Sequence, residues 1–106
     1  MPKFLALASY TAEGVKAVAK AGASNRRDAI GAMYKKMGGK LEVYYYAFGD
    51  FDVVAIGEVP DNVTAAAMSL AINSSGVAHT KTVVLMTPEE IDQATKVNVG
   101  YTPPKT

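Results

Sequence analysis

The sequence predicts an α+β domain with four antiparallel strands and helices placed between and after them. Three observations support this fold class: short apolar runs typical of strands, segments with apolar residues at helical spacing, and glycine or proline breaks between the two kinds of segment. The chain has 106 residues, which fits one domain over residues 1–106. We expect its core at residues 3–97 and a loose tail at 98–106.

The first strand is predicted at Lys3–Tyr10, an apolar run that ends before Thr11. Thr11 is a good residue to cap a helix, but Gly14 and Gly22 weaken the segment that follows. We therefore expect the first helix proper to begin at Ser24 or Asn25. Its buried stripe has i, i+3, i+4 and i+7 spacing, and Gly38–Gly39 ends it. The stripe consists of Ile30, Met33, Tyr34 and Met37.

Two further strands are predicted at Leu41–Phe48 and Phe51–Val59. Gly49–Asp50 between them is typical of a two-residue type II′ hairpin turn, because glycine accepts the positive φ angle of its first position. This register places three aromatic side chains on one face of the hairpin. They are Tyr44 opposite Ala55, Tyr46 opposite Val53 and Phe48 opposite Phe51.

The second half of the chain repeats the alternation. Asp61 or Asn62 is expected to cap an alanine-rich helix that ends near Ser75, and Val77–Met86 is predicted as the fourth strand. Thr87-Pro88-Glu89-Glu90 has the pattern of a capping box, with threonine at the N-cap and glutamate at the third helical position. It predicts a last helix to about Val97.

The order β-α-β-β-α-β is the ferredoxin-like plan, here with an extra C-terminal helix. In this plan the helices cover one face of the sheet, and the other face is bare. Both faces are apolar here, because Val43, Tyr45, Val54 and Ile56 line the face opposite to the aromatic one. We therefore expect a homodimer in which a second copy covers the bare face. The alternative is that the last helix folds across it.

Composition narrows the classes of function. Eleven basic residues against ten acidic ones argue against a nucleic-acid binder, and the dense basic spots are limited to Arg26–Arg27 and Lys35–Lys36. The absence of cysteine excludes thiolate chemistry and disulfides. No apolar run is long enough to span a membrane, and no signal peptide pattern opens the chain. We expect a cytoplasmic protein with no nucleic-acid or membrane partner.

The segment Gly49-Asp50-Phe51-Asp52 resembles the Gly-x-Tyr-Asp signature of the GYD domain family. The resemblance extends to Phe4-Leu5-Ala6-Leu7 with Tyr10-Thr11, to Tyr45-Tyr46, and to Thr80-x-Thr82 followed by Thr87-x-Glu89-Glu90. Phe51 stands where the signature has tyrosine. The resemblance implies a dimeric α+β barrel, an architecture shared by small monooxygenases, isomerases and haem-degrading enzymes, and the family itself has no established biochemistry.

The signature residues Gly49, Phe51 and Asp52 have two interpretations. In the structural one, Gly49 serves the turn, Phe51 packs, and Asp52 accepts hydrogen bonds from free N–H groups around Thr11–Gly14. In the functional one, Asp52 is a general base or a ligand anchor at the mouth of the barrel.

His79 is the only histidine and is expected near the start of the fourth strand, at the same end of the sheet as Asp52. It is a candidate acid, base or haem ligand, although a lone histidine at a strand end is more often an ordinary surface residue. A single histidine does not make a two-histidine metal site, so we expect no metal. No cofactor is predicted, with haem as the alternative.

Two hypotheses follow for the function. The first is a dimeric structural domain or binding domain for a small hydrophobic molecule, with Tyr10, Tyr44, Tyr46 and Phe48 as candidate ligand contacts. The second is a cofactor-independent or haem-linked enzyme, similar to a monooxygenase or isomerase, that acts on a small hydrophobic substrate. Its candidate catalytic residues are Tyr46, Asp52 and His79.

Overall fold

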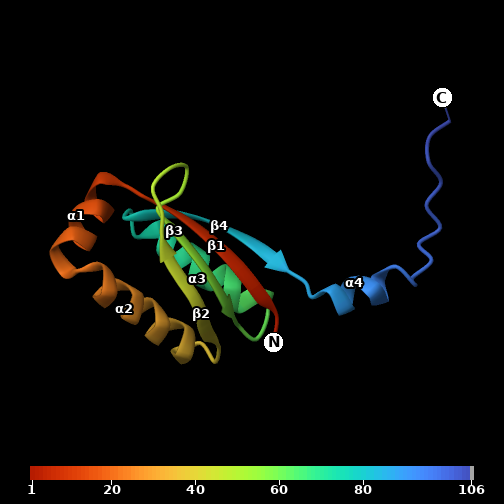
Figure 1. The fold of residues 1–106 in the computed structure, drawn as a ribbon, viewed down its shortest axis with the longest axis horizontal. Helices are drawn as coiled ribbons and strands as arrows, with labels where there is room; N and C mark the ends of the chain where they lie inside the picture. The colour runs from red at the N-terminus through yellow and green to blue at the C-terminus, as the bar shows by residue number, and fades with distance from the viewer. Residues whose placement is uncertain (106) are drawn as a thin grey trace.

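A computed structural model describes residues 1–105 as an antiparallel sheet with helices on one side and a C-terminal extension (Figure 1). The described residues form four strands and four helices. In chain order they are β1 (Lys3–Tyr10), α1 (Ala12–Ala21), α2 (Ala23–Lys36), β2 (Lys40–Tyr46), β3 (Val53–Glu58), α3 (Asn62–Ser74), β4 (Ala78–Leu85) and α4 (Pro88–Ala94). The predicted α+β class is confirmed.

The four strands are arranged in the order β2-β3-β1-β4, and each neighbouring pair is antiparallel. The predicted hairpin register is confirmed at two positions, where Tyr44 lies opposite Ala55 and Tyr46 opposite Val53. The register shifts between Leu41 and Val43. An irregularity of this kind bends the strand locally.

The core lies between the sheet and the helices α2 and α3. One cluster of buried residues comes from a strand, from both helices and from the turn after β3. It consists of Phe4, Tyr34, Val59 and Met68. The predicted stripe on α2 supplies Tyr34 and the half-buried Ile30, Met33 and Met37 around it. The helical spacing of the apolar residues therefore identifies the inward face of α2.

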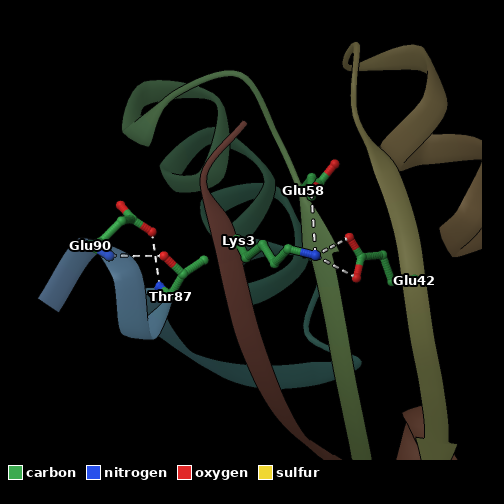
Figure 2. Close-up of polar contacts among 5 residues, drawn as sticks. All are labelled: Lys3, Glu42, Glu58, Thr87 and Glu90. Atoms are coloured by element: carbon green, nitrogen blue, oxygen red, sulfur yellow. Dashed lines mark hydrogen bonds and ion pairs between the residues drawn. The ribbon is translucent and has the colours of Figure 1, made fainter. Parts of the chain in front are cut away.

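Side chains cap three of the helices where the sequence predicts them. Thr11 and Asp61 accept hydrogen bonds from the backbone N–H groups of Gly14 and Thr64. At α4, Thr87 and Glu90 bond each other's backbone N–H, which completes the capping box (Figure 2). These bonds satisfy N–H groups that have no partner within the helix.

The region before α2 is more helical than predicted. The sequence predicts one helix that begins at Ser24 or Asn25. The structure has a ten-residue helix, α1, before it, and α2 begins at Ala23, directly after Gly22. The Thr11 cap starts α1, and Gly22 ends it with a φ of +97°, a conformation that residues with a Cβ rarely adopt. Gly14 lies within α1 and Gly22 at its end, so neither glycine prevents this segment from forming a helix.

The predicted two-residue hairpin turn is wrong. β2 ends at Tyr46 and β3 begins at Val53, and the Ala47 N–H donates to the Asp52 carbonyl at 2.8 Å across a longer loop. Phe48 therefore lies in this loop and is fully exposed, instead of facing Phe51 across paired strands. The Asp52 N–H donates to the carbonyl of Ala8 on β1 instead of to β2, which ends the hairpin ladder early.

The face of the sheet opposite α2 and α3, which we call the open face, is apolar at its centre. Leu5, Leu7, Val54 and Ile56 lie there, half-buried among one another. An ionic cluster borders it at one end, where Lys3 Nζ is 2.7 Å from a carboxylate oxygen of Glu42 and 3.5 Å from one of Glu58 (Figure 2). Hydrogen bonding to Lys3 lowers the pKa of Glu42.

The last helix does not fold across the open face. α4 and the residues around it extend away from the sheet and the other helices (Figure 1). We call residues 86–105 the C-terminal arm; every one of them is exposed. The radius of gyration is 17.0 Å, against about 13 Å for a compact domain of this length. No helix among residues 1–105 is long and apolar enough to cross a membrane.

Candidate functional site

Asp52 fastens the β2–β3 loop to the end of β1. Its carboxylate accepts a hydrogen bond of 2.8 Å from the backbone N–H of Tyr10, one residue before the predicted Thr11–Gly14 segment. The Ser9 hydroxyl donates to the Asp50 carbonyl at 3.2 Å and adds a second tie to the same loop. A charged acceptor makes the stronger kind of backbone hydrogen bond. The geometry therefore gives Asp52 an anchoring role.

The other two signature residues lie on the loop side of this anchor. Gly49 is exposed in the loop. The Phe51 ring is half-buried, and its centroid lies 5.8 Å from Nζ of Lys81 on β4, within the range of a cation–π contact. Phe51 thus packs toward the side chains of β4, and a tyrosine hydroxyl is not part of this contact.

A pocket lies between the helices and the sheet, beside the core. It encloses a cavity of about 80 Å³ and opens to solvent on one side. Each water needs roughly 10–15 Å³ of such space, so the cavity has room for several water molecules or one small ligand. Its apolar wall includes Phe4, Ile30, Met33, Val53, Met68 and Ile72.

Small residues on the sheet create this space. Ala6 and Ala8 on β1, Ala55 on β3 and Ala78 on β4 all point from neighbouring strands toward the helices and line the cavity. A larger side chain at any of these positions would fill the volume between sheet and helix. The cavity is therefore a direct consequence of alanines at the inward positions of three adjacent strands.

The polar part of the pocket lining is dominated by tyrosines. Tyr10 and Tyr44, two of the candidate ligand contacts, both line the cavity. Tyr46 lies behind Tyr44, with their rings packed edge to face at a centroid distance of 5.4 Å. The Tyr46 hydroxyl donates to the carbonyl of Ala23 at 3.1 Å, which ties β2 to the first turn of α2. Tyr46 therefore supports the lining rather than forming it.

The environment keeps the lining tyrosines neutral. Burial, followed by interactions with the neighbouring hydroxyls of Tyr10 and Tyr46, raises the pKa of Tyr44 well above its usual range. Burial also raises the pKa of Tyr10, while the nearby charge of Arg26 acts in the opposite direction. Both hydroxyls are protonated at neutral pH, as an ordinary tyrosine already is, and each carries one proton that it can donate.

Four polar residues of the lining were not predicted as ligand contacts from the sequence: Arg26, Ser69, Thr80 and Thr82. Arg26 of α2 is a half-buried residue of the lining. On the opposite wall, Ser69 of α3 and Thr80 of β4 share a hydrogen bond of 3.2 Å. Arg26 lies four residues before Ile30 and so continues the inward stripe by one helical turn. That spacing is the signal that could have identified it.

His79 and Phe48 are not part of the pocket. His79 pairs with Ser9 at the end of β4 and is exposed, while its neighbours Ala78 and Thr80 line the cavity on the helix side. Because successive strand residues point to opposite faces, His79 belongs to the open face. Phe48 lies in the exposed loop. The structure therefore brings together Tyr10, Tyr44 and Tyr46, but not His79.

The pocket offers hydrogen-bond donors and one positive charge, but no cluster suited to a metal ion. Among residues 1–105, no group of three or more histidine, cysteine, aspartate or glutamate side chains lies close enough to hold one. Asp52 is engaged with the Tyr10 backbone rather than directed into the cavity lining. The arrangement is suited to holding a molecule with an apolar body and a polar end.

Fold and site together define a small α+β domain with a pocket between its sheet and its helices. The chain belongs to the GYD domain family, whose model matches residues 4–95. No curated protein and no solved structure matches the chain. The resemblance noted at the Gly-x-aromatic-Asp segment is thereby confirmed, and it covers all four strands.

Proposed function

We propose that the protein is a binding domain for a small hydrophobic molecule and that it works as a homodimer with a ferredoxin-like, dimeric α+β barrel architecture. The observation that carries the binding function is the cavity beneath α2 and α3. Its alanine floor leaves space that larger residues would fill, and its wall combines apolar side chains with Tyr10 and Tyr44 hydroxyls. Small-molecule sites commonly have this composition.

Binding explains the site better than catalysis does. The three candidate catalytic residues are divided between different places: Tyr46 supports the pocket wall, Asp52 is bonded to backbone, and His79 lies on the open face. A general acid or base must lie within hydrogen-bond reach of the reacting group. No single position in the pocket satisfies this requirement for all three.

The binding function can be tested with phenylacetamide, a neutral molecule with one ring. We expect it to shift backbone amide NMR signals of β1, β3 and α3 around the cavity. Ala6→Leu, which fills the cavity, should abolish these shifts. Ala17→Leu, on the exposed surface of α1, is the matched control and should retain them. Binding that is unaffected by Ala6→Leu would contradict the pocket as the site.

The homodimer is supported by the open face. Leu5, Leu7, Val54 and Ile56 form an apolar centre that no helix of the same chain covers. Burying one such side chain is worth roughly 1.5–3 kcal/mol. A symmetric pair of chains would bury this patch twice through a single kind of contact.

The C-terminal arm is a second apolar surface, and none of residues 1–105 covers it. Its exposed apolar residues are spread along its length and include Ile91, Val97, Val99 and Tyr101, which are between 46% and 78% exposed. The arm points away from its own sheet (Figure 1), so these side chains can be buried only against another molecule. In a symmetric dimer, each arm would extend to the second copy and pack against its surface.

A further inference from the structure

We propose that the molecule bound in the pocket is a small organic anion, with its apolar part against the alanine floor and its anionic group at Arg26 and the hydroxyls of Tyr10 and Tyr44. This inference rests on the proposed binding function and specifies its ligand. It follows from the charge at the pocket, from the donors beside that charge, and from the size of the cavity.

Arg26 is the charged residue of the pocket lining, which contains no aspartate or glutamate. It is half-buried, and it forms no ion pair within the part of the chain that the structure describes. The adjacent Arg27 differs: it is exposed and pairs with Asp28 at 3.1 Å. Partial burial of a charge without a partner is unfavourable, and an anionic ligand would supply the missing partner.

The donors around Arg26 also favour an anion. Tyr10 is close enough for the Arg26 charge to affect its pKa, and Tyr44 lines the cavity beside it. Arg26 lies in the second turn of α2, close to the partly positive start of that helix. A carboxylate accepts hydrogen bonds from both guanidinium and hydroxyl groups. A cationic ligand would instead be repelled by the positive charge of Arg26.

The cavity limits the apolar part of the ligand. At about 80 Å³ the cavity has roughly half the volume of an apolar cavity that binds one benzene ring, about 150 Å³. We therefore expect a short aliphatic chain or one edge of a ring inside the cavity, with the rest of the ligand in its open mouth. The matched anion and neutral molecule for a test are phenylacetate and phenylacetamide, which differ mainly in charge.

The test is a titration of the full-length protein with each molecule at neutral pH, followed by calorimetry or NMR. We expect phenylacetate to bind at least ten-fold more tightly than phenylacetamide. Arg26→Gln should bring the affinity for phenylacetate down to about that for phenylacetamide, and Arg26→Lys should retain part of the preference. Arg27→Gln, which removes an exposed charge one residue away, is the control and should leave the preference intact.

The outcomes separate this inference from the function on which it rests. Equal affinity for the two molecules, or a preference that survives Arg26→Gln, would overturn the anion and leave the binding function standing. Binding of neither molecule would overturn both. If Arg26→Gln does not fold, salt provides the second measurement. Raising ionic strength from about 0.02 to 0.5 M should weaken binding of phenylacetate and not of phenylacetamide, and the absence of any salt effect would contradict the inference.

Discussion

At the scale of single residues, Asp52 gives the Gly-x-aromatic-Asp segment a structural role. Its carboxylate bonds the Tyr10 N–H, while its own N–H bonds the Ala8 carbonyl. One residue thus connects the β2–β3 loop to β1 through both backbone and side chain. Because Tyr10 lines the pocket, this anchor also holds one residue of the pocket wall in place.

Replacing Asp52 should destabilise the fold. Asp52→Ala leaves the half-buried Tyr10 N–H without its acceptor, and we expect the free energy of unfolding to fall by about 1–3 kcal/mol. Asp52→Asn keeps an acceptor oxygen and should lose less. Asp50→Ala, in the exposed loop, is the control. Urea denaturation measures all three; an unchanged midpoint for Asp52→Ala would show that the anchor contributes nothing.

The tyrosines give stability a dependence on alkaline pH. Folding raises the pKa of Tyr10, Tyr34 and Tyr44, in each case chiefly through burial. The unfolded chain then loses protons first as the pH rises above about 10, so stability is fully present below that pH and falls above it. We expect Tyr44→Phe to reduce this fall between about pH 10 and 12, and Tyr101→Phe in the exposed arm to leave it unchanged. Denaturant midpoints measured across this range would decide; equal slopes in both variants would contradict the assignment.

At the scale of elements, the sequence predicts most of the fold. The boundaries of β1 agree at both ends, and the caps at Thr11, Asp61 and Thr87 are where local residue patterns place them. These features depend on neighbours along the chain. The β2–β3 turn does not, because the Asp52 N–H bonds to the Ala8 carbonyl of β1 and only the Asp52 carbonyl bonds across its own hairpin. A rule based on adjacent residues could not detect that long-range contact.

The same distinction applies to the candidate site. Tyr10 and Tyr44 were predictable from strand alternation, which also places them on the inward face. Phe48 falls on that face only if the turn has two residues. Arg26 belongs to the basic pair Arg26–Arg27, although its helical spacing from Ile30 directs it inward. The empty space beside the inward residues depends on the distance between the sheet and the helices. The sequence pattern does not specify that distance.

The contact between α1 and the start of β4 makes a prediction about two glycines. A Cβ on Gly14 would overlap the Val77 carbonyl oxygen, whereas a Cβ on Gly31 of α2 would meet only ordinary contact with Leu41 at 3.8 Å. We expect Gly14→Ala to cost about 1–3 kcal/mol of unfolding free energy. Gly31→Ala should instead stabilise by about 0.5–1 kcal/mol. Thermal or urea unfolding of the pair tests this, and equal effects would contradict the close approach of α1.

At the scale of the whole molecule, two apolar surfaces of one chain remain apart. The C-terminal arm extends away from the sheet (Figure 1), and the core between sheet and helices is small. A small core contributes only a limited free energy of folding. Pairing with a second copy would bury both surfaces and add to that stability.

The arm can be tested separately from the fold because its residues are exposed. We expect Val99→Asp, at a site 78% exposed, to weaken dimerisation by at least ten-fold in its dissociation constant. Val63→Asp, at a site 79% exposed on α3, is the matched control and should leave dimerisation unchanged. Sedimentation at several concentrations gives both constants. An equal, small effect of the two substitutions would contradict a role for the arm.

Native mass spectrometry of the protein purified from the cells that produce it tests both the homodimer and its bound small molecule. We predict a species of twice the 11.2 kDa of one chain, which retains a small molecule in fixed proportion and loses it on denaturation. Identification of that molecule as an organic acid would also support the anion site. A species with the mass of a single chain and no retained molecule, at micromolar protein concentration, would contradict the ligand-binding homodimer.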